Sequence, residues 1–168
     1  MPAVDATKLG RWFDSYGAQL LLYARQWLSR GGEAEDIVQD VFLRLIEQPQ
    51  EPQNVKAWLY RAVRNAAVSA VRTRRRRAER EQHVARDRPE WFQQTPGDLI
   101  DARAAQAALA KLPEAQREIV VLRIWARMTL QEVSETTGLP ISTVHDNYRT
   151  ALAAVRETME SRCPMNNP

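Results

Sequence analysis

Cysteine, glycine and histidine are scarce in this chain, and each scarcity excludes a class of site. Among 168 residues there are one cysteine, Cys163, two histidines and six glycines. A single cysteine rules out a disulfide framework and a zinc site built from several cysteines. The histidines, His83 and His145, are too scattered for a metal cluster. Neither a phosphate-binding glycine loop nor a Ser-His-Asp or Cys-His arrangement is present. We therefore expect no catalytic residue, cofactor or metal.

Long hydrophobic runs are also missing. No stretch approaches the roughly 20 apolar residues that a membrane-spanning helix needs. Residues 1–10 lack the basic-then-apolar pattern of a signal peptide, so a cytoplasmic protein without membrane insertion is expected. Hydrophobic residues make up 44% of the chain and charged residues 27%, which is an ordinary composition for one mid-sized domain or two small ones.

Positive charge is concentrated in one segment. The formal net charge is only +3, but residues 64–88 contain nine arginines and three acids. Arginine offers a planar set of donors that suits phosphate and guanine. A basic segment in a nearly balanced chain favours an anionic partner at one place. A solvated helix face is the alternative that charge alone leaves open.

Helical periodicity runs through nearly the whole chain, so an all-α fold is predicted. Two small helical domains are expected at 5–86 and 98–161, joined by a linker at 87–97 where Pro89, Pro96 and Gly97 interrupt the pattern. The predicted helices span residues 6–29, 33–48, 54 into the arginine run, 98–111, 113–126, 129–138 and 142 onward.

The most specific local pattern lies near the C-terminus. Thr129 and Glu132 match a capping box, and Gly138 is placed to end the short helix that follows. After a turn at 139–140, Ser142 is a good N-cap residue for a longer helix. Its inward positions are predicted to be Val144, Tyr148, Ala151, Leu152, Val155 and Met159. This pattern describes a helix-turn-helix, with a plain αα-hairpin as the alternative.

Polar residues occupy the outward side of that last helix. A recognition helix places its N-terminal residues at base edges in the major groove. Arginine can read guanine there, asparagine can read adenine, and aspartate can accept from cytosine. The outward candidates are Thr143, His145, Asp146, Asn147 and Arg149.

Two further surfaces are predicted in the first domain. Arg72 and the run 74–77 continue a helix that carries Tyr60 and Arg64 on its polar side, and aromatic rings beside arginines suit single-stranded DNA. Tyr60 is the predicted exposed ring, whereas Trp58 is expected in the core. The helix at 33–48 combines a buried stripe with an acidic outer side, which fits a basic protein surface or simple solvation.

These patterns resemble the bacterial sigma factors. Residues 33–44 look like region 2.2, and residues 57–65 with the following arginines look like regions 2.3 and 2.4. Residues 112–123 look like region 4.1, and residues 129–159 look like region 4.2. The presence of regions 2 and 4 alone, joined by a short linker, resembles the extracytoplasmic-function sigma factors.

The resemblance implies an alternative sigma factor that binds core RNA polymerase and directs promoter recognition, melting and transcription initiation. It implies docking on the polymerase β′ coiled coil through Asp36, Gln39, Asp40, Phe42 and Arg44. The melted minus-ten strand would contact the loop 48–56 and Tyr60, Arg61, Arg64, Asn65, Ser69, Arg72, Arg74, Arg75, Arg76 and Arg77. The minus-thirty-five element would contact Ser142, Thr143, His145, Asp146, Asn147 and Arg149, and the same domain would meet the β flap. An anti-sigma or other regulatory protein is the expected further partner.

The chain departs from the family pattern in the recognition helix. Positions 145, 147 and 150 lack the basic residues often found there, and Asp146 adds an acid. Thr137 also stands where leucine is usual. A two-domain helix-turn-helix regulator that is not a polymerase subunit is the alternative function. A nucleotidyl-transfer or RNA-processing enzyme would need clustered carboxylates, but Asp36 and Asp40 have no second pair to join.

Overall fold

The computed structural model describes residues 4–28, 32–81 and 101–161. The chain divides into two units, Met1–Glu90 and Trp91–Pro168. Every regular element in the described residues is an α-helix, which confirms the predicted all-α class. In those same residues no helix is both long and apolar enough to span a bilayer. The linker predicted at 87–97 lies outside the described residues.

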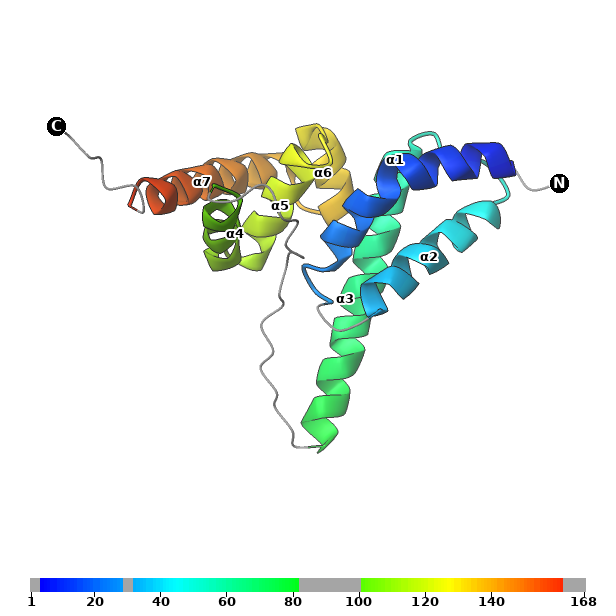
Figure 1. Cartoon of the computed structure of the whole chain (residues 1–168), viewed down its shortest axis with the longest axis horizontal. Helices are drawn as coiled ribbons and strands as arrows, with labels where there is room; N and C mark the ends of the chain where they lie inside the picture. Colours follow the sequence, from blue (N-terminus) through cyan, green and yellow to red (C-terminus); the bar gives the residue numbers. More distant parts are fainter. Residues whose placement is uncertain (1–3, 29–31, 82–100, 162–168) are drawn as a thin grey trace. The chain divides into compact units, whose positions relative to one another are not determined.

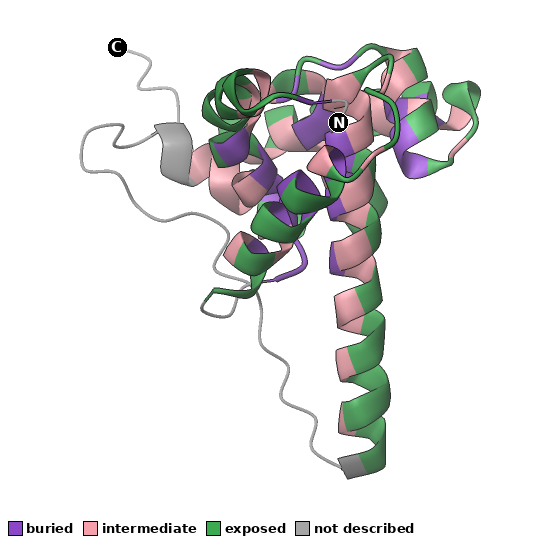
Figure 2. Ribbon diagram, turned by 90° about the vertical axis from the view of Figure 1, so that its right-hand side faces the viewer, coloured by how far each residue is buried: buried purple, intermediate pink, exposed green. Residues whose placement is uncertain are grey.

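The described residues of the first unit form three helices: α1 at Ala6–Ala24, α2 at Glu33–Ile46 and α3 at Val55–Glu81. Each of the three packs against the other two (Figure 1). Because α3 has 27 residues and α1 and α2 have 19 and 14, the C-terminal part of α3 extends beyond its neighbours. That part has no buried residue between positions 68 and 80 (Figure 2).

The starts of these helices have local causes. The Asp5 carboxylate accepts a hydrogen bond from the Lys8 amide at 2.8 Å, and the Asn54 side chain accepts one from the Ala57 amide at 2.9 Å. Both bonds satisfy amides that have no partner inside their helix. α2 instead follows Gly32, whose φ of 86° is a left-handed conformation that glycine adopts without strain.

The core of the first unit is built around aromatic side chains. Tyr23, Trp27 and Tyr60 are buried, and the Tyr23 ring centroid lies 5.1 Å from that of Trp27 and 5.2 Å from that of Tyr60. Contacts of this kind between tilted rings add to the free energy gained by burying their area. Aliphatic side chains from all three helices complete the core: Leu20, Val41, Leu45, Leu59 and Val63.

In the second unit, the part of the chain that the structure describes forms four helices: α4 at Asp101–Lys111, α5 at Glu114–Ile124, α6 at Leu130–Thr137 and α7 at Ile141–Glu160. α7 packs against each of the other three. The buried core comes from all four helices and the turn before α6: Leu109, Ile119, Leu122, Met128, Val133, Val144 and Ala151.

The helix-turn-helix prediction is confirmed in its details around α6. The Thr129 hydroxyl accepts a hydrogen bond from the Glu132 amide at 3.1 Å, and the Glu132 carboxylate accepts one from the Thr129 amide at 2.8 Å. This is the predicted capping box. Gly138 ends α6 with a left-handed φ of 76°, also as predicted.

Some predicted boundaries and orientations are wrong. α1 ends at Ala24 instead of residue 29, and α2 ends at Ile46 instead of residue 48. Ser142 is not an N-cap, because Pro140 already has an extended ψ of 143° and accepts the Val144 amide at 3.0 Å, which starts α7 at Ile141. Leu152 and Met159, predicted to point inward, are exposed, with 37% and 36% of their surfaces accessible.

Candidate nucleic-acid and protein interfaces

The outer side of α2 is an exposed polar face, defined here by Asp36, Gln39, Asp40 and Arg44. It lies opposite the side chains that α2 packs into the core. The first turn of the helix is rich in acids, and the positive end of the helix dipole favours negative charge there. The α2 face is therefore held rigidly and carries net negative charge.

Two neighbouring residues differ from their predicted roles at this face. Phe42 was expected in the polymerase contact, but it is only 5% exposed and its ring meets the Phe13 ring edge-on at 5.1 Å. It belongs to the core and cannot contribute to a docking surface, so that assignment is corrected. Leu43 was missed, although it is 58% exposed. Helical periodicity does indicate that Leu43 is exposed, because this residue falls outside the apolar stripe of its own helix.

One side of α3, called here the α3 DNA face, gathers much of the predicted minus-ten set. A shallow hollow follows this side of the helix. Its lining recurs at helical spacing, which places it on one face: Arg64, Asn65, Val68, Ser69, Arg72, Thr73 and Arg76. Arg61 is exposed one turn before Asn65. The face offers cations for phosphate and amide or hydroxyl groups for bases.

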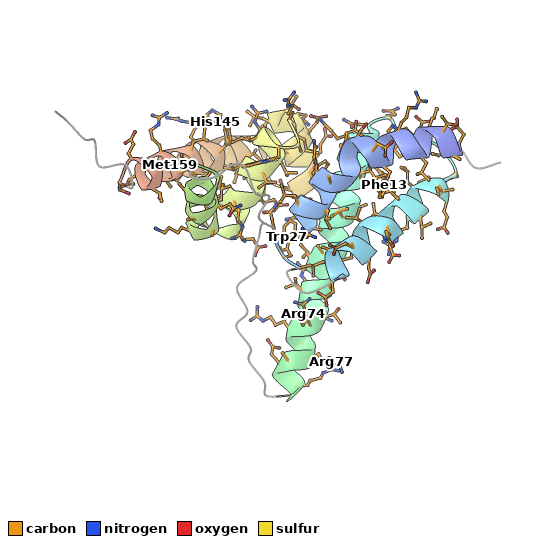
Figure 3. The ribbon with its side chains drawn as sticks, in the orientation of Figure 1. Phe13, Trp27, Arg74, Arg77, His145 and Met159 are labelled. Carbon is orange, nitrogen blue, oxygen red and sulfur yellow. The ribbon has the colours of Figure 1, made fainter. Side chains whose placement is uncertain are left out.

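The arginine run does not act as a single surface. Arg74 turns toward α2 and pairs with Glu33, and Arg77 lines the same groove between α2 and α3. Arg75 pairs with Glu79 one turn further along α3, with 3.0 Å between nitrogen and oxygen. Figure 3 shows Arg74 and Arg77 on the C-terminal half of α3. The helix thus separates Arg72 and Arg76 from the rest of the run.

Tyr60 is buried, contrary to the exposed ring that the sequence predicts. Only 1% of its surface is exposed, and burial raises the pKa of its hydroxyl. That hydroxyl lies 3.3 Å from the Gln19 side-chain oxygen, within hydrogen-bond distance. Since α3 packs against both α1 and α2, its buried side is wider than a single apolar stripe. Tyr60 cannot stack on a base and is removed from the candidate DNA contacts.

The first turns of α7 present most of the predicted outward residues. Ser142, His145, Asp146 and Arg149 are exposed, and His145 lies on the outward side of the helix (Figure 3). Thr143 and Asn147 are half-buried, and the Asn147 amide donates a hydrogen bond to the Thr143 carbonyl at 2.9 Å. The Asn147 nitrogen is therefore already engaged within its own helix.

The turn that precedes α7 explains how Thr137 is accommodated. Thr137 is buried, and its hydroxyl donates to the Val133 carbonyl at 2.8 Å. The Ser134 hydroxyl donates to the Leu139 carbonyl at 2.6 Å across the same turn. Buried polar groups cost stability unless they are paired, and these are. The turn keeps its geometry although threonine occupies a position where leucine is usual.

Two family descriptions match the chain in order. Sigma-70 region 2 matches residues 12–77, which cover α1, α2 and α3 as far as the arginine run. Sigma-70, region 4 matches residues 108–157, which cover α5, α6 and most of α7. The α2 face and the α3 DNA face lie in the first match, and the outward start of α7 lies in the second.

Similar proteins point the same way. The extracytoplasmic-function sigma factor SigL of Mycobacterium tuberculosis is 25% identical over 94% of this chain and 92% of its own length. The sigma factor RpoE of Bartonella quintana, solved in complex with the anti-sigma factor NepR, shares the fold with a TM-score of 0.77 at 22% identity, over 92% of this chain and 98% of that one. CnrH, solved with the cytosolic domain of CnrY, has a TM-score of 0.63 at 24% identity, over 95% and 92%.

Those matches decide against the regulator and enzyme alternatives. Each half of the chain matches one region of the same transcription subunit, in the order that the sequence predicts. The chain therefore belongs to the sigma-70 family, as an extracytoplasmic-function sigma factor that directs transcription initiation and is not itself an enzyme.

Proposed function

We propose that three surfaces share the work of this sigma factor. The α2 face binds the β′ coiled coil of core RNA polymerase, and the α3 DNA face holds the melted minus-ten strand. The start of α7 reads the minus-thirty-five element, while the domain around it meets the β flap. The domain boundaries that accompany this proposal are 5–86 and 98–161, with the linker between them.

The observation that carries the proposal is the composition of the α2 face. Its acids would repel DNA, so a basic protein surface is the partner that fits. Leu43 stands exposed one turn after Gln39 and Asp40. A desolvated apolar side chain within a polar rim is the usual anatomy of a protein interface. α2 supplies both the apolar side chain and the polar rim, and the buried side of the helix fixes them in place.

Charge reversal on α2 tests the polymerase assignment. Asp36→Arg with Asp40→Arg should weaken binding to core polymerase by about a hundredfold or more, because like charges across an interface cost several kcal/mol. Leu43→Ala should weaken it by about fivefold to tenfold as a lost apolar contact. The matched control is Asp14→Arg, since Asp14 is an exposed acid on α1. Unchanged affinity of the double variant in a titration with core enzyme would refute the assignment.

The α3 DNA face is tested by the salt dependence of binding to single-stranded DNA. Each phosphate contact adds about 0.7 to the slope of log affinity against log salt. Replacing both Arg72 and Arg76 by alanine should therefore lower the slope by about 1.4. Arg75→Ala is the control, because Arg75 is outside the lining of the α3 DNA face. A parental slope in the Arg72 and Arg76 double variant would show that this face is merely solvated.

The same proposal places the protein in the cytoplasm, where polymerase and promoter DNA are found, and under the control of an anti-sigma protein. Support for such a partner comes from the two solved structures of similar fold, which are both complexes with an anti-sigma factor or a cytosolic domain. A partner that covers the α2 face would block polymerase binding. Competition between core polymerase and a captured partner for the full chain tests this regulation.

A further inference from the structure

Ile141 is an exposed apolar side chain at the start of the recognition helix. It is the first helical residue of α7, directly after Pro140, and 47% of its surface is exposed. Single exposed hydrophobic residues are common on proteins and need a specific context before they indicate a function. For Ile141 the context is its position, because the N-terminal turn of a recognition helix is the part that reaches base edges.

The residues around Ile141 limit what this end of α7 can read. His145 lies one turn further along the same side and is exposed, with its Nδ1 atom 3.5 Å from the Asp146 carboxylate. The Asn147 amide nitrogen is held by the Thr143 carbonyl. Polar readout at the first turn is therefore sparse, and Ile141 supplies the largest apolar side chain there that is open to a partner.

An apolar side chain has one favourable target in the major groove. Isoleucine cannot donate or accept a hydrogen bond, so it gains nothing from the base atoms that arginine or asparagine would read. The C5-methyl group of thymine is the apolar group displayed there, and it is absent from the other three bases. We propose that Ile141 contacts the methyl group of one thymine in the upstream promoter element. The proposal rests on α7 being the reader of that element.

The other exposed apolar residues of α7 are separate from Ile141. Leu152 and Met159 lie toward the C-terminal end of the helix. Between them and Ile141 stands Tyr148, which is half-buried and has the Arg123 guanidinium 5.3 Å from its ring centroid. This contact between Tyr148 and Arg123 separates Ile141 from the exposed apolar residues further along α7. Ile141 precedes His145 by one turn, and with 47% of its surface exposed it is more open than Leu152 or Met159, which are 37% and 36% exposed.

The test removes the apolar contact from each partner in turn: the thymine loses its methyl group, and Ile141 loses its side chain beyond Cβ. Reconstituted holoenzyme is first used to select a preferred upstream duplex, and each thymine of that duplex is then replaced by deoxyuridine, which lacks only the methyl. At one position the parent protein should bind the deoxyuridine duplex about threefold to fivefold more weakly, as expected for burial of roughly one methyl-sized group. Ile141→Ala should bind the thymine duplex more weakly and no longer distinguish the two duplexes.

The matched control is Ile124→Ala. Ile124 has the same exposure of 47% but belongs to α5 and not to the recognition helix, so this variant should keep the parental preference for thymine. The helical content and melting temperature of both variants establish that each one folds. Persistence of the thymine preference in Ile141→Ala would overturn the proposal. So would an Ile141→Ala protein whose affinity for core polymerase falls in the absence of DNA, since Ile141 would then contact protein.

Failure of the underlying assignment gives a different result. If the parent holoenzyme selects no upstream sequence at all, α7 is not the reader and the proposed function of this surface falls with it. If selection occurs but no thymine position responds to deoxyuridine, only the role of Ile141 is wrong.

Discussion

An ion pair between Glu33 and Arg74 links the start of α2 to the arginine run of α3. Glu33 lies in the first turn of α2, and Arg74 lies in the arginine run of α3. Both side chains are more than one-third exposed, so the pair itself contributes little to the stability of the fold. The pair matters because Glu33 and a DNA phosphate would compete for the same Arg74 guanidinium.

Removing the carboxylate should therefore strengthen DNA binding. Glu33→Gln is expected to raise the affinity of the full chain for single-stranded DNA by about twofold to fivefold at low salt, the range that an exposed pair is worth. One additional phosphate contact should also steepen the salt slope by about 0.7. Fluorescence anisotropy over a salt series measures both quantities.

The double variant identifies the cause. If Glu33 acts through Arg74, the gain from Glu33→Gln should disappear in an Arg74→Ala background. Glu79→Gln serves as the control for general charge, because Glu79 pairs with Arg75, and its effect should survive Arg74→Ala. An equal gain from Glu33→Gln in both backgrounds would mean that only the summed charge matters.

Individual helices show which features the sequence could predict. The α2 stripe and the α6 capping box were correctly predicted, because each depends on side chains close together in sequence. The exposed position predicted for Tyr60 is wrong, since its burial depends on which neighbouring helices pack against it. Phe42 lies in the α2 stripe that the sequence predicts, and only the family resemblance assigned it to the polymerase contact. The pairing of Arg74 with Glu33 was also beyond reach, as the two residues are 41 positions apart. Short-range patterns therefore predicted the elements, and tertiary packing decided which side chains remained available.

The capping box gives a prediction for α6. Thr129→Ala should destabilise the second unit by about 1 kcal/mol, because the Glu132 amide loses its acceptor at the start of the helix. Thr150→Ala is the matched control: Thr150 is exposed in the middle of α7, where alanine is a better helix former. Denaturant unfolding followed by helical circular dichroism measures both. Equal midpoints for the two variants would show that the cap is dispensable.

Each unit has a hydrophobic core of its own, which bears on how the whole molecule unfolds. Leu45 belongs to the core of α1, α2 and α3, and Leu122 to that of α4 to α7. Leucine to alanine at such sites costs about 2–5 kcal/mol. We expect Leu45→Ala to lower the stability of the first unit and Leu122→Ala that of the second.

Hydrogen exchange of the full chain distinguishes the two units, since it reports protection amide by amide. Leu45→Ala should reduce protection in α1, α2 and the first half of α3 while α5 and α7 keep theirs. Leu122→Ala should do the reverse. Loss of protection throughout the chain in either variant would instead indicate one cooperative unfolding unit.

The extension of α3 beyond its neighbours has a consequence for protease sensitivity. Between positions 68 and 80 the helix has no buried residue to anchor it, and it carries one arginine after another. Such a segment opens locally at little free-energy cost, and trypsin cleaves only chain that has opened. The unbound protein should therefore be cut first between residues 72 and 80. A bound DNA strand would hold those turns closed, so the lifetime of this one segment under trypsin reports whether the protein is bound to DNA.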